Sequence, residues 1–107
     1  MSSRGEGLRR TEEEIRADKA ATLGRAGERL EAALAAAAEI RLALDAAVEP
    51  AARDQLRADY EAARTRALDA RRVLLIQREA IGLRNHRVVD VRYPEPPRLP
   101  RTADPRA

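Results

Sequence analysis

Two alanine-rich stretches with a heptad spacing of apolar residues dominate this 107-residue chain. In the first stretch the apolar positions alternate steps of three and four: Leu23, Ala26, Leu30, Ala33, Ala37, Ile40, Leu44 and Ala47. The second stretch repeats the spacing at Leu56, Tyr60, Ala63, Ala67, Ala70, Leu74, Gln77 and Ile81. Such a spacing puts one apolar stripe on each of two helices and is typical of coiled-coil packing.

Local signals predict where these helices begin and end. The segment 11–14, TEEE, matches a capping box and predicts a first helix over residues 11–48. Pro50 suits the first turn of a second helix, expected over residues 51–83, because that position needs no amide hydrogen. The resulting fold class is all-α, an antiparallel two-helix coiled-coil-like hairpin over residues 11–84.

The ends of the chain are expected to lie outside this hairpin. Residues 1–10 have no periodic pattern and are predicted to be disordered. Residues 85–107 contain five prolines and are predicted to be an extended or disordered tail. Within this tail, Val89, Val91 and Tyr93 alternate with charged residues, which predicts a strand that pairs with the sheet edge of a partner.

The run VLLI at residues 73–76 carries more apolar bulk than one facing helix can cover. In a hairpin that turns near residue 50, this run lies opposite Gly24 and Gly27, whose missing side chains predict close packing there. The expected surplus of apolar surface consists of Leu68, Leu75, Ile76 and Leu83. A second copy in a homodimer or four-helix bundle, a different protein, or the chain's own tail are three alternative covers for it.

Arginine supplies 20 of the 21 basic residues, a usage typical of GC-rich bacterial genomes. Four arginines recur every seven residues beside the apolar stripe of the second helix: Arg57, Arg64, Arg71 and Arg78. One interpretation pairs them with carboxylates such as Glu31 and Asp45 on the facing helix. A second interpretation makes them a basic strip for nucleic-acid phosphates. Arg84, His86 and Arg87 follow the second helix and form either its C-terminal cap or an anion grip.

The sequence lacks the residues and motifs that several classes of chemistry require. The chain has no cysteine, one histidine and no zinc-binding or phosphate-binding motif, so we expect no metal, cofactor or small-molecule substrate. No serine or cysteine stands at a suggestive spacing from His86, so no catalytic residue is predicted. The chain also lacks a run of about 18 apolar residues or a secretory signal, and a soluble cytoplasmic protein that is not membrane-bound is expected.

These observations favour a non-enzymatic interaction or scaffolding module. Its expected contacts are the surplus apolar residues of the second helix together with a recognition arm that contains Val89, Val91 and Tyr93. The expected partners are a second copy of the chain, another protein, or both. The alternative hypothesis is an accessory protein that contacts nucleic acid through the arginine-rich second helix and tail.

Overall fold

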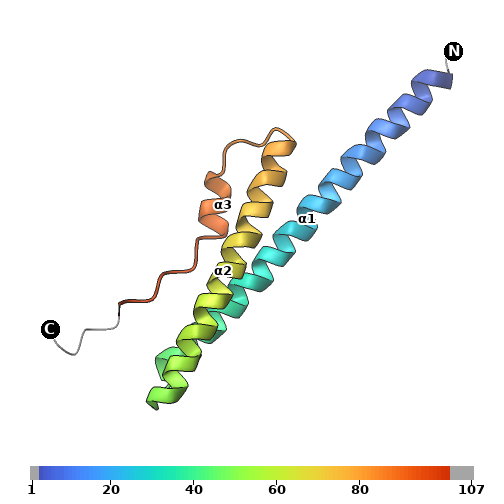
Figure 1. The fold of residues 1–107 in the computed structure, drawn as a ribbon. Coiled ribbons are helices and arrows are strands. Elements are labelled where there is room, and N and C mark those ends of the chain that lie inside the picture. The colour runs from blue at the N-terminus through green and yellow to red at the C-terminus, as the bar shows by residue number, and fades with distance from the viewer. Residues whose placement is uncertain (1–2, 102–107) are drawn as a thin grey trace.

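The fold is an antiparallel helical hairpin with a short third helix and an extended C-terminal segment, as the computed structural model of residues 3–101 shows (Figure 1). The molecule is elongated, with principal extents of 81 × 22 × 17 Å. No helix within residues 3–101 is both long and apolar enough to cross a bilayer. The helices are α1 (Ser3–Ala46), α2 (Pro50–Ala80) and α3 (Arg87–Arg92).

The heptad stripes form the contact between α1 and α2, as the sequence predicts. One buried cluster joins Ala26 and Leu30 of α1 to Leu74 of α2, and Val89 of α3 completes it. A second cluster near the turn joins Ala37 to Tyr60 and Ala63. Because alanine occupies many of the contact positions, this core is narrow, and each alanine buries little apolar area.

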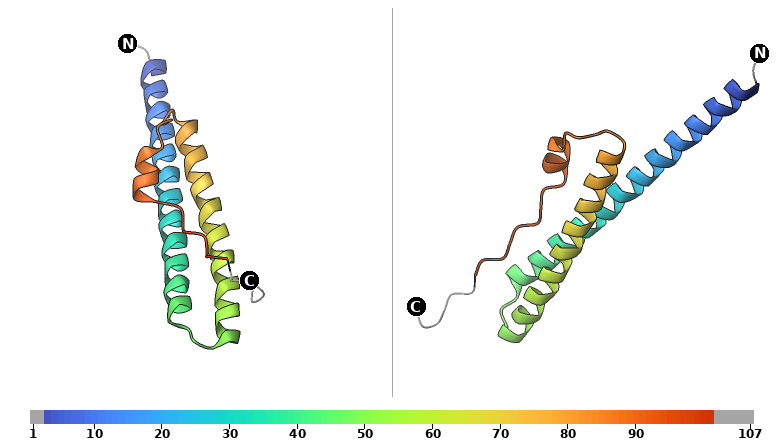
Figure 2. Two further views of the ribbon diagram at one scale, coloured as in Figure 1. Left: turned by 90° about the vertical axis from the view of Figure 1, so that its left-hand side faces the viewer. Right: turned by 45° about the horizontal axis from the view of Figure 1, so that its top comes forward.

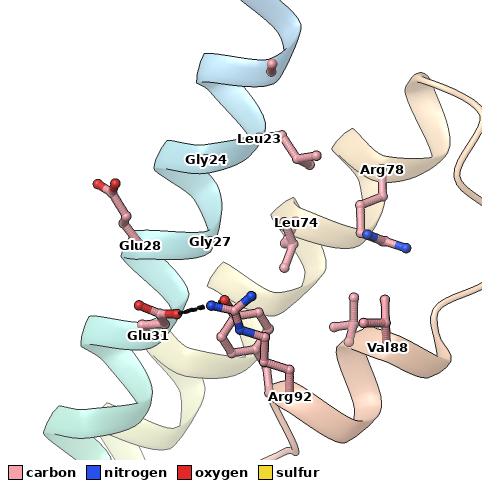
Figure 3. Close-up of a pocket in the computed structure, with 12 residues that line it drawn as sticks. Leu23, Gly24, Gly27, Glu28, Glu31, Leu74, Arg78, Val88 and Arg92 are labelled. Atoms are coloured by element: carbon pink, nitrogen blue, oxygen red, sulfur yellow. Dashed lines mark hydrogen bonds and ion pairs between the residues drawn. The ribbon is translucent and has the colours of Figure 1, made fainter.

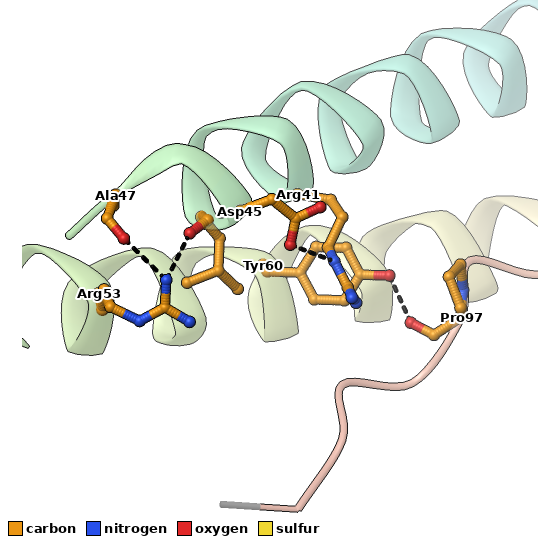
Figure 4. Close-up of polar contacts among 7 residues, drawn as sticks. Arg41, Asp45, Ala47, Arg53, Tyr60 and Pro97 are labelled. Atoms are coloured by element: carbon orange, nitrogen blue, oxygen red, sulfur yellow. Dashed lines mark hydrogen bonds and ion pairs between the residues drawn. The ribbon is translucent and has the colours of Figure 1, made fainter.

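An arginine closes the turn between the two long helices. The Nη1 atom of Arg53 donates hydrogen bonds of 2.8 Å to the carbonyls of Leu44 and Ala47 (Figure 4). The last carbonyls of an α-helix have no partner within the helix and carry its negative dipole end. The guanidinium from the first turn of α2 therefore satisfies the end of α1.

The end of α2 is a glycine cap. Gly82 has a φ of +88°, which a glycine adopts without the cost of a Cβ clash. The amide of Gly82 donates to the carbonyl of Glu79, and the amide of Leu83 donates to the carbonyl of Arg78. These two bonds form a Schellman motif, which ends the helix and reverses the chain toward α3.

The start of α1 differs from the expected one. The helix begins at Ser3 instead of Thr11, and the side chain of Thr11 donates a 3.0 Å hydrogen bond to the carbonyl of Gly7 within the helix. The capping box predicted at residues 11–14 is therefore not formed. No proline interrupts residues 3–10, and Leu8, Arg9 and Arg10 favour the helix. With 44 residues against 31, α1 extends past the end of α2 as a single exposed helix (Figures 1 and 2).

The segment expected to be a strand is the short helix α3. Amides of Val89 and Asp90 bond the carbonyl of His86, and the amide of Tyr93 bonds the carbonyl of Val89. The spacing of Val89 and Tyr93 fits one helix face as well as one strand face, because a turn of helix returns after four residues. Val91, expected on the same side, instead points away and is 76 % exposed. The packing of Val89 against the hairpin favours the helix over the strand.

The predicted packing role of the glycines in α1 is also corrected. A Cβ at Gly24 would have no atom within 4 Å, so the bulk of residues 73–76 does not fill the space beside it. Only Gly27 has a near neighbour, because a Cβ there would lie 3.8 Å from the hydroxyl of Tyr93. The first helix is nevertheless continuous through both glycines, as the sequence predicts.

We expect Gly24→Ala to raise the free energy of unfolding by about 1 kcal/mol, since alanine favours a helix interior and meets no obstacle here. Gly82→Ala is the contrasting variant and should lower the free energy of unfolding by about 1 kcal/mol, because its φ is left-handed. Urea denaturation followed by circular dichroism measures both. A loss of stability in Gly24→Ala would mean that another part of the chain lies within 4 Å of a Cβ at residue 24.

Candidate functional site: an arginine row and the C-terminal arm

The C-terminal arm, residues 87–101, runs back along the hairpin from the tip of α2 toward the turn (Figures 1 and 2). After α3 the arm is extended, and its burial repeats every third residue. Tyr93 is half-buried, Pro96 is buried and Leu99 is half-buried, whereas the residues between them are exposed. This is the period of a polyproline II helix, which presents one face every three residues. One face of the arm therefore lies against the hairpin.

The arginine row, defined as Arg57, Arg64, Arg71 and Arg78, binds backbone carbonyls of the C-terminal region. Each guanidinium donates to one carbonyl: Arg57 to Pro100 at 3.0 Å, Arg64 to Pro96 at 2.9 Å, Arg71 to Tyr93 at 3.2 Å and Arg78 to Asn85 at 3.0 Å. Between the first two, the hydroxyl of Tyr60 donates to the carbonyl of Pro97 (Figure 4). A heptad series on one helix thus holds a second segment of the same chain.

The repeats of the helix and of the arm match in length. Arg57 and Arg71 are two heptads apart, which is about 21 Å along an α-helix at 1.5 Å per residue. The carbonyl-bearing residues that they bind, Pro100 and Tyr93, are seven positions apart, or about 22 Å at the 3.1 Å rise of polyproline II. Equal lengths allow successive arginines to reach successive turns of the arm without a change of register.

The prolines explain why side chains and not a sheet edge hold the arm. Residues 94, 96, 97 and 100 are prolines and have no amide hydrogen, so a β-ladder cannot form through them. Their carbonyls remain strong acceptors that need donors when they approach other protein atoms. Long arginine side chains supply these donors from a helix, whose own backbone groups are already paired.

Arg71 adds charge recognition to this pattern. Its guanidinium forms ion pairs with Asp90 in α3 and with Glu95 in the extended part of the arm, the latter at 3.7 Å. The side chain of Arg71 is only 12 % exposed, whereas both carboxylates are more than half exposed. A shielded cation between two anions of the arm thus links the arm to the hairpin electrostatically.

A cleft of about 480 Å³ lies where α1, α2 and α3 meet (Figure 3). Leu23, Leu74 and Val88 give it apolar walls, and Glu31 pairs with Arg92 at its edge. The hydroxyl of Tyr93 donates a 2.9 Å hydrogen bond to the carboxylate of Glu31. Burial, followed by this hydrogen bond, raises the pKa of Tyr93 above its ordinary value. The phenol therefore stays neutral and holds the arm to α1.

The structure divides the residues predicted to bind a partner into two groups. Val89 and Tyr93 pack against the chain's own hairpin, and Leu75 lies half-buried against the same cluster. Half-buried Leu68 lines a small cleft beside the arm with Arg64, Arg71 and Glu95. Exposed positions are Ile76, at 57 %, together with Leu83 and Val91. The chain's own arm thus covers part of the surplus that the sequence left to three alternative covers.

The arginine row does not pair with the carboxylates that the sequence predicts for it on the facing helix. Glu31 pairs with Arg92 and Asp45 pairs with Arg41, so the row does not use these carboxylates. Beyond α2, the Nε2 atom of His86 lies 2.9 Å from a carboxylate oxygen of Glu79. Arg84 and Arg87 are exposed, and the backbone amide of Arg87 donates to the side chain of Asn85. The predicted helix stop is present at Gly82. The contacts of His86 and Arg87 do not bring Arg84, His86 and Arg87 together around a common site.

Sequence reasoning missed Pro96 and Leu99, and it missed the roles of Glu31 and Tyr60 in holding the arm. The heptad spacing places Tyr60 in the stripe of α2, where its ring is indeed buried, but its hydroxyl reaches past the stripe to the arm. A repeat of three at residues 93, 96 and 99, set beside a repeat of seven at the arginines, is the signal that would have found this site.

Two further observations concern the described residues and the chain's relatives. Among residues 3–101, no group of three or more histidine, aspartate or glutamate side chains is placed to hold a metal ion. Comparison of the chain with protein-family models, with curated proteins and with solved structures finds no match.

We expect the phenol of Tyr93 to titrate above the ordinary value of about 10. Because its folded pKa is raised, its contribution to arm docking is fully present below about pH 10 and is lost as the pH rises through the folded pKa. Glu31→Gln should lower the pKa of Tyr93, since it removes the neighbouring negative charge, whereas Glu28→Gln should not. Carbon-13 NMR of the tyrosine rings measures this. Equal titration midpoints of Tyr93 in Glu31→Gln and in the parent chain would contradict the hydrogen bond between Tyr93 and Glu31.

Proposed function

We propose that this protein is a non-enzymatic interaction module whose hairpin binds an extended proline-rich segment, with its own arm as one such segment. The main support is a row of side-chain donors on α2, each of which donates a hydrogen bond to a carbonyl of the arm. These donors are Arg57, Tyr60, Arg64 and Arg71. Carbonyl recognition suits proline-rich ligands, because prolines keep their carbonyl acceptors and have no amide hydrogen to donate. Such ligands also lose little conformational entropy on binding.

Apolar contacts support the same proposal. Leu99 packs against the cluster of Ala37, Tyr60 and Ala63, and Val89 completes the cluster around Leu30. An apolar residue at each end of the arm, with a buried proline between, provides affinity that hydrogen bonds to exposed carbonyls alone do not.

We do not propose nucleic acid as the main partner. The four guanidiniums that the alternative hypothesis assigns to phosphates already donate to carbonyls of the chain. A phosphate strip formed by them would require the arm to leave first. The acidic residues Asp90 and Glu95 also lie beside Arg71 and lower the local positive potential.

The test separates the hairpin from its arm. We expect a chain truncated after residue 86 to bind a synthetic peptide of residues 87–101, as measured by isothermal titration calorimetry. Arg64→Ala should weaken binding about 10- to 100-fold, because a hydrogen bond from a charged donor contributes about 1.5–3 kcal/mol. Tyr60→Phe should weaken it less, since it loses one neutral hydrogen bond and keeps the buried ring.

Arg66→Ala is the matched control, because this exposed arginine lies on the same helix two residues from Arg64. It should leave peptide affinity unchanged, and circular dichroism should show the same helix content in all variants. An equal loss in Arg64→Ala and Arg66→Ala would mean that overall charge governs binding and would overturn the carbonyl site. Steep loss of binding to a generic duplex between 50 and 200 mM salt, with no affinity for the peptide, would favour nucleic acid instead.

A further inference from the structure

We infer that two copies of this chain exchange their arms, each arm occupying the groove of the other copy, to form a symmetric dimer. This inference rests on the proposed function, since it uses the same row of donors and the same carbonyls. Every copy carries both halves of the interaction, and all the contacts described for the arm can form between copies as well as within one. Reciprocal exchange of this kind gives an isologous, closed interface.

The connection between the hairpin and the arm has the properties of a hinge. Residues 81–85 are exposed, and the chain reverses direction at Gly82. Side chains tie this connection to α2 through two contacts, Arg78 to the carbonyl of Asn85 and His86 to Glu79. Five extended residues span about 17 Å, which is comparable to the 22 × 17 Å cross-section of the molecule. An opened hinge therefore reaches a hairpin that lies alongside.

Exposed apolar side chains also occur on the hinge and on the helices that flank it. The larger members of this group are Val73, Ile76, Ile81, Leu83, Val88 and Val91, all of them exposed. Within one copy the docked arm covers other residues and leaves these in contact with solvent. In the exchanged dimer we expect the two hinges to lie next to each other, so that these side chains contact those of the second copy. The cover that the single copy lacks is therefore supplied where the exchange takes place.

The charges of the arm and the groove provide a way to force exchange. Arg71 lies between Asp90 and Glu95 of the arm. Arg71→Glu reverses the charge of the groove, and the double variant Asp90→Arg with Glu95→Arg reverses the charge of the arm. Each variant alone brings like charges together, both within one copy and between identical copies. In a mixture of the two, each arm finds an oppositely charged groove only on the other variant.

The experiment uses full-length chains and native mass spectrometry. We expect each charge-reversed variant alone to be monomeric, and an equimolar mixture to give a dimer that contains one copy of each. Substitution of all three residues in one chain restores opposite charges, and this triple variant should dock its arm as the parent chain does. Protection of the α3 amides from hydrogen exchange measures docking in every sample.

The possible failures are distinguishable. A mixture that remains monomeric, while the triple variant docks its arm, overturns the exchange and leaves the proposed function intact. Single variants whose α3 amides stay as protected as in the parent chain overturn the proposed function as well, because the arm then does not depend on Arg71. Dimers of equal abundance in the mixture and in each single variant also overturn the exchange, since association would then occur through another surface.

Discussion

Hydrogen bonds from side chains of one helix to proline-rich carbonyls are the interaction on which the third layer of this molecule depends. An alanine-rich hairpin buries little area along its seam, and a third element is needed to cover Leu30, Leu74 and Tyr60. A third helix would supply apolar side chains but leave the arginine row without acceptors. The arm supplies both, since its side chains pack every third residue and its carbonyls face the guanidiniums.

The shape of the guanidinium explains why arginine suits these positions better than lysine. A lysine ammonium is a single strongly hydrated point charge, whereas a guanidinium presents several donors in a fixed plane. Arg71 uses this property to contact the carbonyl of Tyr93 and two carboxylates at once. At Arg53 a single guanidinium nitrogen, Nη1, joins two carbonyls at the end of α1. The bias toward arginine, which a GC-rich genome explains in general, thus has specific structural uses here.

The extent to which the sequence predicted this structure differs between its parts. The two heptad stripes predicted the hairpin, its turn near Pro50 and most of its buried positions correctly, because those depend on repeats of local spacing over long helices. Ile81, at the end of the second stripe, is exposed because α2 ends at Ala80. The beginning of α1 and the strand at residues 88–93 were wrong. Both predictions rested on short motifs, and one turn of α3 is stabilised by the burial of Val89 and not by its own sequence.

By itself, the sequence determined two helices, the faces they share and a segment of prolines that cannot continue either helix. Only the tertiary structure decided where that segment lies and which residues the arginine row binds. The physical reason is that helix spacing is a property of consecutive residues. The pairing of Arg64 with Pro96, 32 positions apart, instead depends on a match between two repeats that becomes visible only when both segments lie side by side.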